Sequence, residues 1–231
     1  MVRASAPCSH RINLWSMSTP EPTAAAPADA ADTADRGPDG DRVDITDASR
    51  MRALAHPARL AIIDHLSGSG PATATECAAV VGLSPSATSY HLRALARAGF
   101  VEHAESRGDG RERLWRSVAE HYRIDQDATN ATYRAAESAL VDAVLAWQDA
   151  RSRQFLSTMY ETESPEWREA ASLSERAVLV TAAELTELLG RVDRMIEEMS
   201  RTNRPDPPPG ARRVLVMLRA FPAKGVAGPK M

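Results

Sequence analysis

The chain has 231 residues, of which 43% are hydrophobic and 26% are charged, and its formal net charge is −3. This composition is sufficient for one medium or two small hydrophobic cores and excludes a wholly disordered protein. No apolar run approaches the roughly eighteen residues of a membrane-spanning helix, and the first residues lack the apolar core of a signal peptide. We therefore expect a cytoplasmic protein with no membrane partner.

Both ends of the chain are predicted to be tails. Residues 1–43 are rich in Ala, Pro, Asp and Thr and have almost no large apolar residues after Trp15. Such a segment cannot offset the entropy of ordering, so we expect a disordered tail here and a second one over residues 223–231. Met17 is an alternative start of the chain.

Four helices are predicted between residues 46 and 99. The first carries Met51 and Leu54 on one face, and Pro57 opens the second, which ends in the Gly- and Ser-rich run 67–71. Thr73 and Glu76 have capping-box spacing and begin the third helix, which reaches Val81. After the turn at Gly82 and Leu83, Ser84 and Pro85 begin the fourth helix, which ends at Gly99. Two helices joined by a tight glycine-containing turn predict a helix-turn-helix.

A β-hairpin is predicted directly after the fourth helix. Residues 100–104 and 113–118 are strand-like runs that flank Gly108-Asp109-Gly110. A hairpin in this position is a wing, so residues 44–120 are predicted to form a winged helix-turn-helix domain.

A long helix is predicted from about residue 127 to 160, because Ala136, Leu140, Val144, Trp147 and Met159 recur near helical spacing. This apolar face has two interpretations. It is either core of the same subunit or, as we favour, a homodimer contact, since a two-fold regulator needs a self-complementary surface to span paired half-sites.

The C-terminal part is predicted to be a strand-helix-strand appendage. Residues 177–180 are strand-like, Thr181 and Glu184 form a second capping box, and residues 214–221 are strand-like again. The expected fold class is thus mainly α with small β, and residues 121–222 are expected to hold the dimerisation helix and this α/β appendage.

The fourth helix carries the candidate DNA contacts. Thr88, Leu92 and Leu95 share its inward face. The other side presents small polar, aromatic and basic residues: Ser86, Ser89, Tyr90, Arg93 and Arg97. A helix in the major groove reads base edges with its first turns and holds phosphates with later ones. We expect Ser86, Ser89 and Tyr90 to lie near bases and Arg93 near phosphate or guanine; the alternative is a merely solvated surface helix.

The wing adds further arginines at its mobile tip. Arg107 and Arg111 are the expected contacts with a minor groove or backbone, whereas Arg113 could serve a structural pair instead. The acids Asp109 and Glu112 weaken this assignment. From Ser84 to Arg116 there are six arginines against four acids, which is a modest basic excess.

Residues 47–118 resemble the winged helix of the ArsR-type bacterial regulators. Three blocks carry the resemblance and occur in the family's order and spacing: Arg52 to Ile63, Leu83 to Leu92, and Leu95 to Val101. The resemblance implies a homodimer that binds double-stranded promoter DNA, most often as a repressor, with its recognition helix at residues 84–98. His91 matches a frequent family position near DNA, and bracing the helix is its alternative role.

The family's metal sensing is not predicted here. Cys77 has no second thiol within a turn, one thiolate cannot build a soft metal site, and residues 123–160 contain no histidine. Cys8 and Cys77 also give no disulfide framework. We find no phosphate loop and no nucleophile elbow, so no cofactor, metal or catalytic residue is expected.

Two further hypotheses stay open. The mild local charge is compatible with a winged-helix protein-interaction module that does not bind DNA directly. Within the regulator hypothesis, Trp147, Trp167 and the Met-rich face of the last helix either line a small-molecule effector pocket or form plain core.

Overall fold

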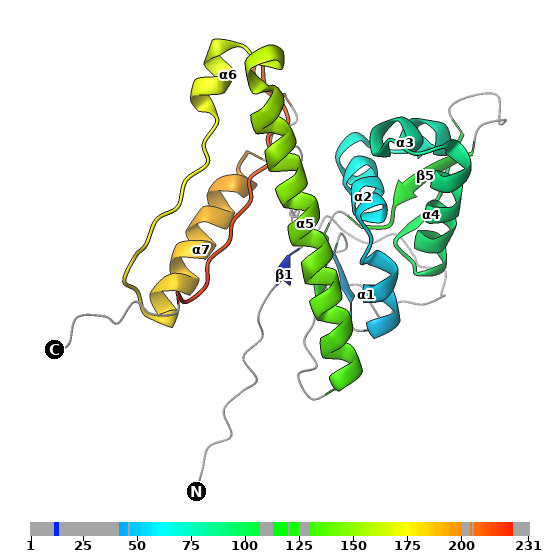
Figure 1. Cartoon of the computed structure of the whole chain (residues 1–231), viewed down its shortest axis with the longest axis horizontal. Helices are drawn as coiled ribbons and strands as arrows, with labels where there is room; N and C mark the ends of the chain where they lie inside the picture. Colours follow the sequence, from blue (N-terminus) through cyan, green and yellow to red (C-terminus); the bar gives the residue numbers. More distant parts are fainter. Residues whose placement is uncertain are drawn as a thin grey trace, which may run out of the picture. The chain divides into compact units, whose positions relative to one another are not determined.

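The computed structural model describes residues 12–13, 42–45, 47–106, 113–119, 121–124, 130–199, 204 and 206–223. The chain divides into two compact units, residues 1–149 and residues 150–231. Figure 1 shows the helices and strands of both units. Most of the two expected tails lies outside the described residues.

The first unit is built from three short helices and a small sheet, preceded by α1 (Ala48–Leu54). The three helices are α2 (Pro57–Ser69), α3 (Ala74–Val81) and α4 (Pro85–Arg97). The sheet strands are β3 (Ala72–Thr73), β4 (Val101–Ala104) and β5 (Leu114–Ser117), in the order β3-β5-β4. Both pairings are antiparallel. These elements confirm the predicted helix-turn-helix and the two wing strands.

Local signals explain where these helices begin and end. Thr73 and Glu76 form the predicted capping box, in which the Glu76 amide donates to the Thr73 hydroxyl at 3.1 Å and the Thr73 amide donates to the Glu76 carboxylate at 2.7 Å. Gly82 ends α3 with a φ of 66°, a left-handed conformation that favours glycine. Ser84 begins α4 by accepting a hydrogen bond from the Ala87 amide at 3.2 Å. The turn between α3 and α4 is therefore specified by its own residues.

A second sheet closes the first unit and was not predicted. Its strands are β1 (Ile12–Asn13), β2 (Arg42–Ile45) and β6 (His121–Ile124), in the order β1-β6-β2. β2 and β6 are parallel, and the Arg123 guanidinium holds the Asp44 carboxylate through two bonds of 2.8 and 3.0 Å. This bidentate pair fixes the register of two strands that lie far apart in the sequence.

The long helix α5 (Ala131–Thr162) is present, and its first half belongs to the winged-helix unit. Ala136, Leu140 and Val144 are buried in the same core as α2 and α4, and Trp147 packs against that core. The expectation that this part of the stripe contacts a second copy is thus wrong, because the chain's own core covers it.

The second unit holds the end of α5, the short α6 (Pro165–Ala170) and α7 (Ala182–Glu197). Thr181 and Glu184 form the capping box predicted for α7. The strands expected over residues 177–180 and 214–221 are absent, and both segments are extended chain without a strand partner among the described residues. A strand needs a neighbour to satisfy its backbone groups, and the described part of the chain provides none.

Candidate nucleic-acid interface

The outward face of α4 forms the candidate interface. Thr88, Leu92 and Leu95 are fully buried, as predicted, and the Thr88 hydroxyl donates to the Ser84 carbonyl at 3.0 Å. The residues on the other side are exposed or half-buried. Ser86, Tyr90, Arg93 and Arg97 are exposed, whereas Ser89 and His91 are half-buried.

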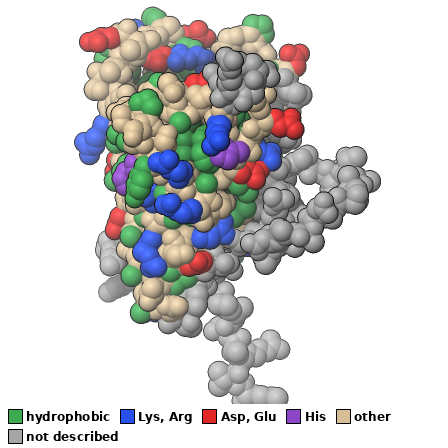
Figure 2. Space-filling view, turned by 90° about the vertical axis from the view of Figure 1, so that its right-hand side faces the viewer, with side chains coloured by type: hydrophobic (Ala, Val, Ile, Leu, Met, Phe, Trp, Pro, Cys, Tyr) green, Lys and Arg blue, Asp and Glu red, His purple; other side chains and the backbone are tan. Residues whose placement is uncertain are grey.

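Arg93 and Arg97 supply the charge of this face. The structure gives neither guanidinium an ion pair with any described residue, so both charges are available to a ligand. On the wing, by contrast, Arg116 pairs with Glu102 across β4 and β5. Figure 2 shows arginine side chains gathered near the middle of the face that carries α4, with most of the visible acidic ones nearer its margins.

The dimensions of α4 suit a groove of duplex DNA. Its 13 residues make a rod about 20 Å long. The major groove is about 12 Å wide and admits one α-helix. Serine hydroxyls and the Tyr90 ring lie on the first turns, where base edges are read, and the arginines follow on the later turns.

His91 contacts another helix of the domain, which matches the bracing role given above as its alternative. Its ring lies 4.7 Å from the ring of His56, measured between centroids, and 5.6 Å from the ring of Tyr90. His56 caps α2, because its Nδ1 accepts the Ala58 amide at 3.1 Å. The Nδ1 of His91 is buried without a hydrogen-bond partner among the described residues. The two histidines thus join the start of α2 to α4.

Burial makes both histidines favour the neutral form. Desolvation lowers the pKa of His56, and the nearby Arg59 charge lowers it further. Desolvation also lowers the pKa of His91, with smaller contributions from His56 and Arg59. The capping role of His56 could have been predicted from the sequence, since this residue stands directly before Pro57 at a helix start. Its contact with His91 joins two helices, and no local sequence pattern marks such a contact.

Arg50 ties the two ends of the helical domain together. Its Nε donates to the Ala98 carbonyl at 3.1 Å, and its guanidinium lies 5.2 Å from the centre of the Phe100 ring. This contact fixes the end of α4 against α1 and so helps to hold α4 in position.

The remaining candidate residues fall into two groups. Arg107 and Arg111 lie outside the described residues. Cys77 is buried, and burial together with Glu76 raises the pKa of its thiol to about 11, so the thiol stays protonated at neutral pH.

No group of three or more His, Cys, Asp or Glu is placed to hold a metal ion within the described ranges. None of the described helices is long and apolar enough to cross a membrane.

The two tryptophans of the effector-pocket hypothesis lie in different units of the structure. Trp147 packs against the winged-helix core, whereas Trp167 belongs to the second unit, where Arg212 lies 4.8 Å from its ring centre. Trp147 therefore matches the alternative in which it is plain core.

Comparison with known proteins places the winged helix in a family. A family described as helix-turn-helix domain matches residues 54–104. The HTH-type transcriptional regulator YgaV of Escherichia coli (strain K12) is 37% identical over 84 residues, which make up 36% of this chain and 75% of that protein.

Two solved structures are also similar. One is the homodimeric winged helix-turn-helix DNA-binding domain of a possible ArsR-family regulator from Mycobacterium bovis, with 26% identity over 42% of this chain and 76% of that one, at a TM-score of 0.29. The other is ZitR from Lactococcus lactis, with 16% identity over 63% and 84%, at a TM-score of 0.27. Because these TM-scores are low, the assignment depends on the sequence relative. This chain belongs to the helix-turn-helix transcriptional regulators and is a DNA-binding protein.

Proposed function

We propose that the protein is a cytoplasmic homodimeric repressor that inserts α4 into the major groove of promoter operators. One observation carries this proposal: α4 buries Thr88 and Leu92 and leaves Arg93 and Arg97 exposed without an ion pair to a described residue. Exposed cations on the outward face of the second helix of a helix-turn-helix are placed to contact the phosphates of duplex DNA. The protein-interaction module is the less favoured alternative.

Each contact residue has a proposed role. Ser86, Ser89 and Tyr90 approach base edges, and Arg93 holds a phosphate or a guanine. Arg97 holds a phosphate one turn later, and His91 contributes mainly by bracing α4 against His56. For Arg107 and Arg111 the proposal rests on the wing sequence, where an arginine favours a narrow minor groove.

The C-terminal unit is the proposed place for regulation. It lies outside residues 54–104, which the helix-turn-helix family matches, and it is where a small-molecule effector would act on this regulator. We assign the protein no enzymatic activity and no cofactor.

The test is a selection of genomic fragments by the purified protein, repeated with Arg93→Ala and with Arg111→Ala. Both variants are expected to bind the selected fragments more weakly. Removing a base contact relaxes the sequence preference at one position, whereas removing a phosphate contact weakens binding to all sequences alike. Arg153→Ala, which removes an exposed arginine of α5 outside the proposed contact residues, is the control and should bind like the unaltered protein. Unchanged affinity in both test variants would remove the proposed interface.

A further inference from the structure

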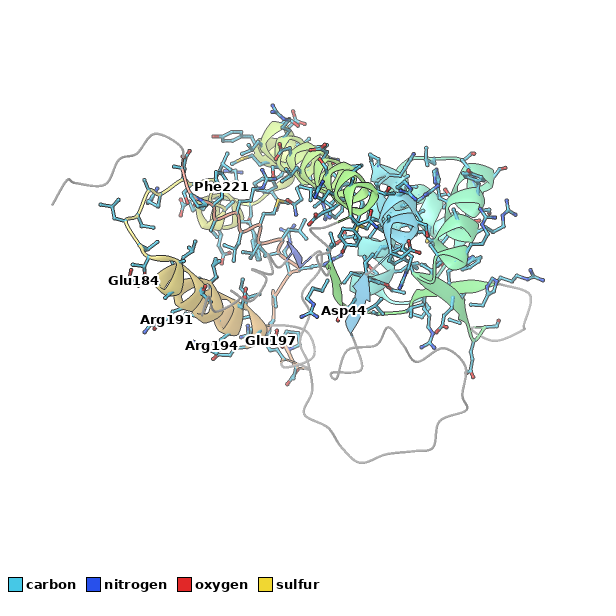
Figure 3. All side chains as sticks on the ribbon, turned by 90° about the horizontal axis from the view of Figure 1, so that it is seen from below. Asp44, Glu184, Arg191, Arg194, Glu197 and Phe221 are labelled. Atoms are coloured by element: carbon cyan, nitrogen blue, oxygen red, sulfur yellow. The ribbon has the colours of Figure 1, made fainter. Side chains whose placement is uncertain are left out.

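Helix α7 has an apolar face that the second unit covers only in part. Four of its apolar residues are half-buried: Leu185, Leu189, Val192 and Ile196. The adjoining row of the same face is exposed, with Leu188 at 43% and Met195 at 61%, and Met199, two residues beyond the end of α7, continues it at 69%. Figure 3 shows the polar residues Glu184, Arg191 and Arg194 along the helix. A helix of this length is stabilised mainly by burying its apolar face, so the exposed row implies a missing partner.

The two extended segments beside α7 also expose apolar side chains. In residues 177–180, Val178 is 60% exposed and Leu179 is 69% exposed. In residues 214–218, Val214 is 61% exposed and Leu215 is 42% exposed. Successive residues of an extended chain point to opposite sides, so each segment is apolar on both sides. This pattern is typical of a strand that is covered on both faces of a sheet.

The two segments do not pair with each other in a single chain. Figure 1 shows them running on either side of α7. Residues 212–217 are held beside the end of α5, because Arg212 pairs with Glu163 at 2.6 Å and the Ser152 hydroxyl lies 3.7 Å from the Met217 sulfur. Both segments therefore keep backbone edges that are open to pairing with another strand.

The exposed apolar surface is large enough for a dimer. Of the eighteen large apolar side chains that are exposed in the described residues, fourteen belong to the second unit. Ten of these fourteen lie in the row Leu188, Met195 and Met199 or in residues 177–180 and 214–218. Because a fully buried aliphatic side chain removes roughly 60–120 Å² from water, these ten partly exposed side chains offer roughly 500 Å² per chain. A standard interface buries about 800 Å² per partner, of which a little over half is apolar. The available area matches this requirement.

We propose that the C-terminal unit is a dimerisation module, in which a second copy of the chain covers the Leu188–Met195–Met199 row and pairs with residues 177–180 and 214–218 as strands. Two copies together contribute four strand segments, whereas an isolated strand or a lone pair is marginal in water. A two-fold partner presents the same unsatisfied segments, which makes the interface self-complementary. The inference rests on the proposed homodimer and locates its interface.

The first test measures mass and amide protection together. The molar mass of the full chain is determined by light scattering over a concentration series, and hydrogen exchange is followed at the same concentrations. We expect peptides covering residues 177–180 and 214–218 to become protected in step with the dimer fraction. A dimer whose two segments exchange like an unstructured chain would overturn the inference and leave the homodimer intact. A monomer at every concentration would overturn both.

The second test changes the exposed row of α7. Met195→Glu is expected to raise the dimer dissociation constant at least ten-fold, because each dimer then buries two carboxylates at its interface. The substitution should leave the single chain folded, since Met195 is 61% exposed there, and circular dichroism checks the helix content. Thr186→Glu is the matched control, because Thr186 lies on the opposite side of α7 and is also exposed. An equal effect of both substitutions, or no effect of either, would contradict the proposed interface.

Discussion

At the scale of single residues, the pair His56 and His91 makes a specific prediction about pH. Burial lowers the pKa of both side chains, so the unfolded chain takes up protons first as the pH falls. The free energy of unfolding should be highest above about pH 6.5 and should fall as the pH drops from there toward the lowered pKa values. Urea denaturation at a series of pH values measures this.

His56→Asn separates capping from titration. Asparagine is a good N-cap residue but carries no proton in this range, so the variant should keep most of its stability at neutral pH and lose part of the pH dependence. His65→Asn is the control, because His65 lies on α2 but on the side opposite to His56. This variant should keep the pH dependence that His56 and His91 cause. A pH dependence that is identical in His56→Asn and the unaltered protein would show that His56 does not contribute.

The sequence predicted some residue roles and missed others for a physical reason. The inward placement of Thr88, Leu92 and Leu95 follows from the 3.6-residue period of a helix, which a single segment displays. The contact between His56 and His91 joins two helices that the sequence separates, so no local pattern encodes it.

At the scale of elements, the N-cap of α4 gives a prediction that separates stability from binding. Ser84→Ala removes the acceptor of the Ala87 amide and should lower the free energy of unfolding by about 1 kcal/mol. Ser84→Asp restores an acceptor and should keep stability within a few tenths of a kcal/mol. Because Ser84→Asp puts a negative charge at the end of the helix that we place in the groove, it should still weaken DNA binding.

Denaturation and DNA titration of both variants check this. If Ser84→Asp binds DNA as tightly as the unaltered protein, the start of α4 does not face the duplex. If Ser84→Ala is as stable as the unaltered protein, the Ser84 hydroxyl does not act as a cap.

Helices and the wing were predictable because their signals are local. Caps, glycine turns and the alternating wing strands mark their own boundaries, and β4 and β5 lie within one residue of the expected bounds at each end. The parallel pair β2 and β6 was missed, since each strand has only four residues and its partner lies on the far side of the winged helix in the sequence. Residues 177–180 and 214–221 have strand-like composition, but a ladder also depends on a neighbour, which the sequence of one chain does not display.

At the scale of the whole molecule, the two apolar helix faces differ in whether the chain covers them. The stripe Ala136, Leu140 and Val144 stabilises the chain's own winged helix, whereas the apolar face of α7 is left partly uncovered. The sequence showed both stripes and could not tell which of them meets the same subunit, because periodicity identifies a buried face without identifying what buries it.

Net charge is also a property of the whole molecule. With an overall charge of −3, the protein has no general attraction for a polyanion, so we expect DNA binding to depend on the exposed arginines of α4 and on the arginines in the wing sequence. Such binding must release counterions from the duplex where those arginines contact phosphates.

The measurement that tests this account most directly is the affinity of the full chain for a random-sequence duplex as a function of salt. Between about 50 and 200 mM salt, the logarithm of the association constant should fall linearly with a slope of about −0.9 for each phosphate neutralised. If Arg93 contacts a phosphate, Arg93→Ala should reduce the magnitude of that slope by about 1 for each copy bound. An absence of binding at the lowest salt concentration would contradict the assignment of α4 as a DNA-reading helix.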